Sequence, residues 1–370
     1  MIYIVIFAFL ISVVLAMFMI PRILLLSYKK RLFDIPNARK IHKTPVPRLG
    51  GLSFLPVIII TFCFVLALSF LLTVPIESQW HSILLIQFLL FFVGLCIIYV
   101  VGIYDDLVGV SYRFKFFAQF LVGILIVTSG LWINNLGGIF GIHEISAWIG
   151  MPLTVLFIVY TINAINLIDG VDGLAAGLCC LSLIAISFIC IATHQWIYAL
   201  LNVICLGAVM VFFYYNVISK KTKKIFMGDA GSMSLGFLLS FTTIHFWQKL
   251  PWWNPFDNNS YFLVLSSLLI PLLDVVRVFL TRIRCHQNPF LPDRNHIHHK
   301  LIRTGMSLPW VMINILIMSV SFFLLNYLLL LFINTTLIIF LDIILWTLMH
   351  KIINYFIIRH SRIINRQLKL

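Results

Sequence analysis

Carboxylate and amide side chains gather in one short stretch of an otherwise apolar chain. Residues 163–174 read Asn-Ala-Ile-Asn-Leu-Ile-Asp-Gly-Val-Asp-Gly-Leu and lie between two long apolar runs. An aspartate at the centre of a bilayer costs about 2.5–3.5 kcal/mol on insertion scales. We therefore expect these side chains at a helix end, where water, a cation or a polar ligand reaches them. Asn163 and Asn166 share one helix face, and Gly170 and Gly173 relax the backbone where that helix unwinds.

Two other stretches supply carboxylates. Asp105 and Asp106 are adjacent at the end of an apolar run, where like charges repel unless a cation or protons intervene. All-oxygen ligation of this kind suits a magnesium ion that bridges a diphosphate; a hydrated surface pair is the alternative. Asp229 follows Gly228 at the start of another apolar run. A helix beginning there offers free N–H groups to an anion, or Asp229 is simply its N-cap.

Cationic groups that suit phosphate lie in two further loops. Residues 40–51 carry basic side chains with two prolines and two glycines, which suits either a phosphate-binding lip or a plain basic loop. Residues 292–301 add an arginine, which binds phosphate bidentately, and three histidines. Zinc is disfavoured because no cysteine or Glu-x-x-His partner accompanies them. The candidates in these two loops are Lys43, Arg48, Arg294, His296, His298 and His299.

The composition indicates which elements position these groups. The chain has 370 residues, of which 62% are hydrophobic and 10% charged, with a mean hydropathy of +1.07. These values predict an all-α, polytopic integral membrane helix bundle, which we treat as one transmembrane domain over residues 1–370. The net charge of +14 lies mainly between the apolar runs, so it indicates membrane topology rather than a nucleic-acid partner.

Eleven apolar runs are candidate spans, since a span needs about 20 residues. They cover residues 2–26, 50–73, 83–103, 115–133, 149–167, 174–193, 196–216, 231–247, 260–280, 309–331 and 335–357. Lysine and arginine concentrate in the loops that follow odd-numbered spans and in the C-terminal tail. This asymmetry predicts an outside N-terminus and a cytoplasmic C-terminus, with every polar stretch above on the cytoplasmic side.

Taken together, the polar stretches resemble the polyprenyl-phosphate N-acetylhexosamine-1-phosphate transferase family of integral membrane enzymes, of the glycosyltransferase 4 type. The resemblance covers Arg39 to about Gly305 and implies ten or eleven spans with a cytoplasmic active site, in the bacterial inner membrane. Its loops fit the branch that uses UDP-N-acetylglucosamine better than the triple-histidine branch that uses UDP-MurNAc-pentapeptide. A full Asp-Asp-x-x-Asp box is absent. The motifs that carry the resemblance are Tyr104-Asp105-Asp106-Leu107, residues 163–173, Met227-Gly228-Asp229-Ala230-Gly231-Ser232 and His296-Ile297-His298-His299.

The resemblance implies transfer of N-acetylglucosamine-1-phosphate from the UDP-sugar to polyprenyl (undecaprenyl) phosphate. UMP is released, and a lipid-linked cell-surface glycan such as an O antigen begins. It implies Mg²⁺, or Mn²⁺, at Asp229 with Asn166 nearby. The implied catalytic residues are Asp105, Asp106, Lys115 and His298. The implied substrate-binding residues are Lys43, Arg48, Asn163, Asp169, Asp172, Arg294, His296 and His299.

Alternatives stay open at this point. Another UDP-N-acetylhexosamine or UDP-MurNAc-pentapeptide suits the same constellation. An ion-coupled membrane transporter also places Asp, Asn and His in spans, but it predicts polar residues at mid-span, whereas here they crowd one side. A general base is not required, because a phosphate monoester with a second pKa near 6 is largely dianionic at pH 7. The expected partners are the two substrates and membrane lipid; prenyl length and a homodimer are left open.

Overall fold

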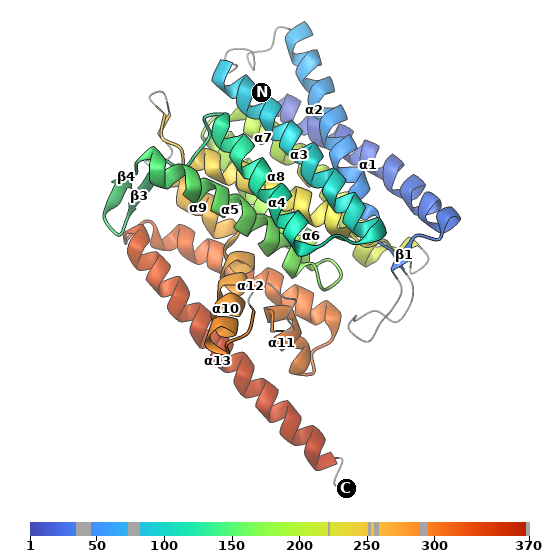
Figure 1. The fold of residues 1–370 in the computed structure, drawn as a ribbon, viewed down its shortest axis with the longest axis vertical. Helices are drawn as coiled ribbons and strands as arrows, with labels where there is room; N and C mark the ends of the chain where they lie inside the picture. The colour runs from blue at the N-terminus through green and yellow to red at the C-terminus, as the bar shows by residue number, and fades with distance from the viewer. Residues whose placement is uncertain are drawn as a thin grey trace.

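The chain folds into a helical bundle with two small β-hairpins (Figure 1). The computed structural model describes residues 1–34, 46–72, 82–220, 223–250, 253–254, 259–288 and 295–367. The helices are α1 (Ile2–Lys30), α2 (Phe54–Leu71), α3 (Ser82–Val108), α4 (Tyr112–Thr128), α5 (Ala147–Ile168), α6 (Leu174–Ala192), α7 (Trp196–Phe213), α8 (Gly228–Phe246), α9 (Ser260–Ser267), α10 (Leu269–Arg284), α11 (Ile297–Arg303), α12 (Leu308–Leu329) and α13 (Thr335–Gln367). Antiparallel hairpins join β1 (Phe33–Asp34) to β2 (Val46–Pro47) and β3 (Asn135–Ile139) to β4 (Ile142–Glu144).

The all-α, multi-pass membrane architecture is confirmed. Within the described residues, eight helical segments are long and apolar enough to cross a membrane, or nine if α9 and α10, bent by 65°, form one span. Each of the eleven predicted spans coincides with a helix or with this bent pair. However, α4 has only 17 residues, and α8 is rich in glycine, serine and threonine. The count of eleven therefore stays a prediction.

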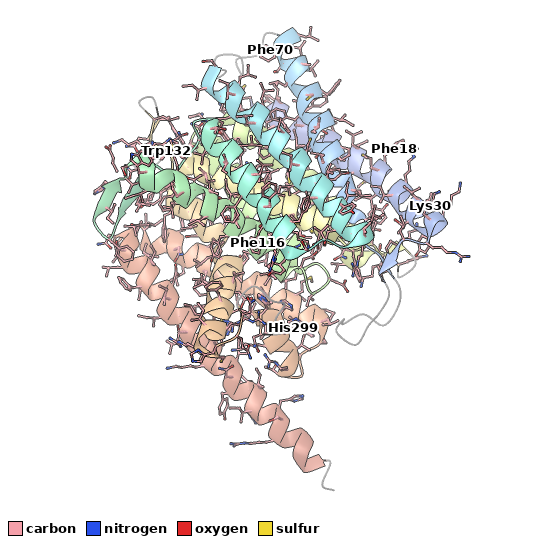
Figure 2. All side chains as sticks on the ribbon, viewed as in Figure 1. Phe18, Lys30, Phe70, Phe116, Trp132 and His299 are labelled. Carbon is pink, nitrogen blue, oxygen red and sulfur yellow. The ribbon has the colours of Figure 1, made fainter. Side chains whose placement is uncertain are left out.

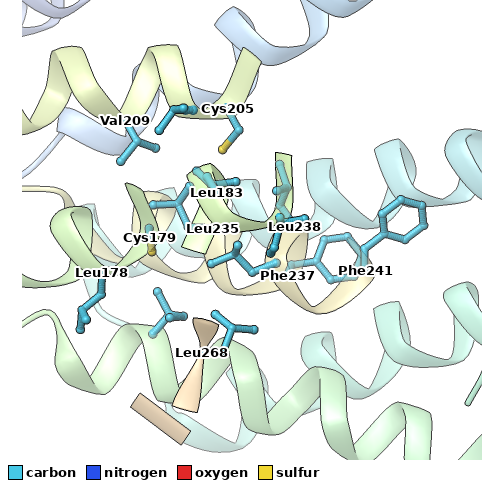
Figure 3. Packing of buried hydrophobic residues seen from close by; sticks show 14 of the residues in the cluster. Leu178, Cys179, Leu183, Cys205, Val209, Leu235, Phe237, Leu238, Phe241 and Leu268 are labelled. Atoms are coloured by element: carbon cyan, nitrogen blue, oxygen red, sulfur yellow. The ribbon is translucent and has the colours of Figure 1, made fainter. Parts of the chain in front are cut away.

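Helix α8 lies at the centre of the bundle, which explains how it tolerates its polar residues. Every residue from Ala230 to Phe246 is buried, so the helix faces protein rather than lipid. Figure 3 shows its apolar side chains among those of α6 and α7. On another side Phe91 of α3 stacks on Phe241 with ring centroids 4.3 Å apart. A helix surrounded by protein need not have the apolar surface that lipid demands.

The two ends of the bundle differ in chemistry. At one end, the β3–β4 hairpin adjoins the loop after α8, where Asn134 exchanges two hydrogen bonds with the backbone of Lys249. At the other end, α3, α5 and α10 finish while α4, α8 and α11 begin. There Gly102 of α3 packs so closely on α8 that a Cβ on it would lie 2.4 Å from the Cα of Ala230. This contact fixes the first turn of α8 beside the end of α3.

Candidate active site

Asp229, in the first turn of α8, is the meeting point of side chains from four helices. The ammonium group of Lys115 on α4 lies 2.5 Å from Asp229 Oδ2 and 2.7 Å from Asp105 Oδ2 on α3. The amide of Asn166 on α5 donates to Asp229 Oδ1 at 3.2 Å and to Ser232 Oγ at 2.8 Å. Three of the predicted polar stretches therefore converge, together with Lys115.

Asp106 of α3 caps the N-terminus of α8 next to Asp229. Its two carboxylate oxygens accept the backbone N–H groups of Asp229 at 2.9 Å and Ala230 at 3.1 Å. An anion at a helix N-terminus is stabilised by these free N–H groups and by the helix dipole. Gly228 permits the arrangement: its φ is +73°, and a Cβ on it would lie 2.5 Å from Asp106 Oδ2. The capping anion is thus an aspartate from α3, not Asp229 or a ligand.

The turn after α5 is held by an amide that the sequence analysis did not single out. Asn216, which is buried, accepts the N–H of Gly173 at 2.6 Å and donates to the carbonyl of Ile225 at 2.8 Å. It thereby ties the turn to the strand-like segment that leads into α8. Asp172 forms an ion pair with Lys224 in the same region. The signal that could have identified Asn216 is an amide near the end of an apolar run, as at Asn163.

Negative charge exceeds positive charge around Asp229. Partial burial at the end of α5, followed by the charges of Asp229, Asp106 and Asp172, raises the pKa of Asp169 to about 8. Asp169 is therefore mostly protonated at neutral pH, chiefly because burial disfavours its ionised form and secondarily because neighbouring carboxylates repel it. Within the cluster built around Asp229, the ammonium of Lys115 balances only part of the carboxylate charge.

This cluster suits a hard divalent cation in donor chemistry. Its carboxylate oxygens are ligands that magnesium prefers, and its acidic side chains favour a cation, whereas Asn166 directs its amide NH₂ at Asp229 and would have to turn to offer its oxygen. Across the described residues, however, no three His, Cys, Asp or Glu side chains stand in a metal-ligating arrangement. The physical reason is that Lys115 occupies the position between Asp105 and Asp229. The residues fit magnesium, provided that Lys115 shares or leaves these oxygens.

The histidines of α11 reach the turn after α5. A Cβ on Gly170 would lie 2.5 Å from His298 Nε2, so this imidazole packs directly on the turn next to Asp169. The ring of His298 is parallel to that of His296 at 6.0 Å and lies 4.2 Å from that of His299, which Figure 2 labels. Burial, together with the adjacent imidazoles, lowers the pKa of His298 to about 3. His298 is therefore neutral at physiological pH.

Three cationic side chains surround the start of α11. Arg277 of α10 bonds to the carbonyl of Asn295, and Arg303 donates to its side-chain oxygen at 3.1 Å. Burial, followed by the charges of Arg277 and Arg303, lowers the pKa of Lys300 to about 8. The positive charge of these side chains favours an anion, and Asp274 already supplies one to Arg277 at 2.8 Å.

The remaining predicted residues lie elsewhere or outside the description. Asn163 does not join the carboxylates; its amide donates to Gln119 on α4 at 2.6 Å and to its own helix. The backbone carbonyl of Arg48 packs against Gly228. The segment after it pairs with the approach to α8, because the N–H of Gly50 donates to the carbonyl of Phe226 at 2.8 Å. Two predicted substrate-binding residues lie outside the described residues: Lys43 and Arg294.

Comparison with known proteins identifies the family of this chain. Residues 88–246 match the model of glycosyl transferase family 4. Over 301 residues, 81% of the chain, the sequence is 32% identical to the "probable undecaprenyl-phosphate N-acetylglucosaminyl 1-phosphate transferase" of Bacillus subtilis (strain 168), of which the match covers 78%. The chain belongs to this transferase family. Undecaprenyl-phosphate alpha-N-acetylglucosaminyl 1-phosphate transferases of Yersinia pestis and Escherichia coli K12 are 31% and 30% identical over 76% and 75% of the chain, and 72% and 71% of their own length is covered.

The family match and the cluster overlap in the sequence. The matched segment of this transferase contains Asp105, Lys115, Asn166 and Asp229, whereas α11 and its histidines lie beyond it. The longer match to the Bacillus subtilis transferase extends over most of the chain. The roles of individual residues remain predictions. The structure adds which side chains these residues contact.

Proposed function

We propose that this transferase moves N-acetylglucosamine-1-phosphate from UDP-N-acetylglucosamine to undecaprenyl phosphate. An oxygen of the lipid phosphate attacks the sugar-side phosphorus, the bond from that phosphorus to the bridging oxygen breaks, and UMP leaves. The observation that carries the proposal is the cluster of Asp105, Lys115, Asn166 and Asp229 at the end of the bundle where the histidines of α11 also lie. The names of the curated relatives supply the donor sugar and the lipid.

Positioning and charge neutralisation are the main demands of phosphoryl transfer. Lys115 suits the lipid phosphate, because its ammonium group is partly exposed and already held by two carboxylates. Asp105 keeps that ammonium group in place, and its other oxygen accepts the N–H of Val110 at 2.7 Å. The lipid phosphate is largely dianionic at pH 7 and needs no base to attack.

We infer that Mg²⁺ is held by Asp229 with Asn166 when substrate is bound, and Mn²⁺ would fit the same donors. The ion supplies neutralisation of the diphosphate charge. Asp106 contributes by fixing the first turn of α8, so that the carboxylate of Asp229 faces Asn166 and Lys115. A bound divalent cation would also lower the pKa of Asp169, whose carboxyl group interacts with those of Asp229 and Asp106.

The histidines of α11 and the basic side chains near them suit the donor substrate. Neutral His298, with His296 and His299 beside it, offers hydrogen bonds to the diphosphate or the sugar. Around them Arg277, Lys300 and Arg303 attract the negative charge, and Arg294, which lies outside the described residues, stays a predicted contributor. We assign the nucleotide to the side of the Asp172–Lys224 pair. Lys43 and Arg48 stay predicted contacts, and Lys43 lies outside the described residues.

The proposed orientation follows from the substrates. UDP-sugars are soluble, and the basic loops of this chain predict the cytoplasm at the end where the cluster lies. We propose eleven spans, an outside N-terminus and an active site on the cytoplasmic face of the bacterial inner membrane. The prenyl tail then stays in lipid while its phosphate reaches Lys115 at the interface. The alternative of a mid-membrane ion path loses support because the acidic cluster lies at one end of the bundle.

The activity is tested with purified protein, labelled UDP-N-acetylglucosamine and undecaprenyl phosphate. Transfer of label to the organic phase, dependent on Mg²⁺ and accompanied by UMP, is the expected result. Asp229→Asn should lower kcat at least about 100-fold, as loss of one electrostatic group at a transition state does. Asp342→Asn is the matched control, because Asp342 is a buried carboxylate on α13 that bonds to Asn326. Full activity of Asp229→Asn removes the metal assignment, and a panel of UDP-sugars tests the donor.

A further inference from the structure

Asp274 is a buried carboxylate of α10 whose two oxygens are fully used. Its side chain is 1% exposed. Oδ1 accepts Arg277 Nη2 at 2.8 Å, and Oδ2 accepts His296 Nδ1 at 2.9 Å. The N–H of Ile297, the first residue of α11, reaches both oxygens, at 3.0 and 3.2 Å. The ion pair with Arg277 is therefore only one of three contacts of this carboxylate.

These contacts give Asp274 two effects on α11. The carboxylate satisfies a free N–H at the helix start, a role normally filled by an adjacent N-cap residue. It also decides which nitrogen of His296 carries the proton. A carboxylate can only accept, so Nδ1 must donate, and a neutral imidazole then presents Nε2 as an acceptor.

The ring that Asp274 orients is the first of a row that leads to the candidate active site. His296 is 4% exposed, and its ring is parallel to that of His298 at 6.0 Å. His298 in turn packs on Gly170, next to Asp169. A change in the ring plane or tautomer of His296 therefore alters the polar group offered beside His298.

We propose that Asp274 is a positioning residue that fixes the Nδ1–H tautomer and ring plane of His296 and thereby sets its Nε2 for the donor substrate. Asp274 acts on catalysis only through His296. The inference rests on the proposed function where it assigns His296 to the UDP-sugar. The tautomer itself follows from the buried contacts alone.

The discriminating substitution is Asp274→Asn. Arg277 can only donate, so the amide oxygen turns to Arg277 and the amide NH₂ faces His296 Nδ1. His296 must then accept at Nδ1 and carry its proton on Nε2, the reversed tautomer. We expect kcat/KM for UDP-N-acetylglucosamine to fall about 10- to 100-fold, as when a carboxylate that orients a histidine is lost. His296→Gln should cause a similar loss, and the double variant should lose no more than His296→Gln alone.

Asp342→Asn is again the control, because it neutralises a buried carboxylate away from α11. Additive losses in the double variant, or wild-type kinetics of Asp274→Asn, would overturn the proposal even though the wild type is active.

An independent test measures the ¹⁵N NMR signals of the histidine rings in the wild-type protein. Comparison with His296→Gln identifies the signals of His296. Protonated Nδ1 and unprotonated Nε2 are expected; the opposite tautomer, or a ring protonated at both nitrogens, overturns the proposal whether or not Asp274→Asn folds. If the wild-type protein had no transferase activity, the proposed function would be wrong, but the NMR measurement of the His296 tautomer would still be valid.

Discussion

At the scale of single residues, the ammonium group of Lys115 lies between two carboxylates that could otherwise bind a metal ion. Its ammonium group contacts one oxygen of Asp105 and one of Asp229, and all three side chains are largely buried. A cation bound to a carboxylate pair lowers its affinity for a second cation. The lysine therefore has two opposite effects: it attracts the lipid phosphate and competes with magnesium.

Lys115→Gln separates these effects. We expect turnover to fall at least about 100-fold, because a charged contact to phosphate is lost. We also expect Mn²⁺ or Mg²⁺ to bind the free protein at least about tenfold more tightly, because two carboxylates lose their counter-charge. The measurement is the rise in melting temperature with divalent cation concentration. Lys249→Gln, at the opposite end of the bundle, is the control. Weaker cation binding in Lys115→Gln would contradict the competition.

His298 gives a prediction about stability and pH. Its pKa is about 3 in the folded protein, below the usual value of about 6.5 for an unfolded chain. The unfolded chain therefore takes up the proton first, and the free energy of unfolding falls as pH drops below about 6.5, until about pH 3. Linkage gives a loss of about 2 kcal/mol at pH 5 relative to neutral pH.

The check is the melting temperature of wild type and His298→Gln between pH 8 and 4. His298→Gln should lose less stability on acidification than wild type. His143→Gln, which changes an exposed histidine of β4, should follow the wild-type curve. Parallel curves for wild type and His298→Gln would show that His298 is not the buried neutral imidazole described here.

At the scale of elements, the site depends on the close approach of α3 to α8. Gly102 touches Ala230 at the first turn of α8, where Asp106 caps the helix. Gly102→Val inserts bulk that this contact cannot hold, so α8 must shift. We expect a loss of about 1–3 kcal/mol of stability together with a fall in kcat. Val100→Ala, on the exposed face of the same helix, should change neither, as judged by melting temperature and turnover. Wild-type turnover of Gly102→Val would show that Asp229 does not depend on this packing.

The sequence could predict which stretches end helices but not how the helices meet. Asp105, Asp169 and Asp229 are too costly for lipid, so their places at helix ends followed from composition. The cap of α8 by Asp106, the Lys115 bridge and the Asp274–His296 bond could not be predicted, because they depend on the register between helices far apart in the chain. The sequence also could not show that Asn163, on the same helix face as Asn166, bonds to Gln119 rather than to the carboxylates, and its predicted substrate contact stays a prediction.

At the scale of the whole molecule, α13 extends beyond the rest of the bundle at the end where the site lies (Figure 1). It has 33 residues, or about 50 Å of helix, against about 30 Å of hydrocarbon core. It packs on α11, where Lys300 bonds to Asn354 at 2.9 Å. The proposed topology puts this overhang, the histidines of α11 and Cys285 after α10 in the cytoplasm.

A membrane-impermeant maleimide tests this topology. Cys285 is exposed, so it should be labelled only after cells are permeabilised. Glu144→Cys in a Cys285→Ser background should be labelled in intact spheroplasts, because Glu144 lies in the exposed β4 strand at the opposite end. The Cys285→Ser background alone is the control for the other six cysteines, of which Cys63 on α2 is exposed. Labelling of Cys285 in intact cells would overturn the proposed topology. It would also overturn the proposed donor, because UDP-sugars do not cross a bilayer and could not reach a site on the outer face.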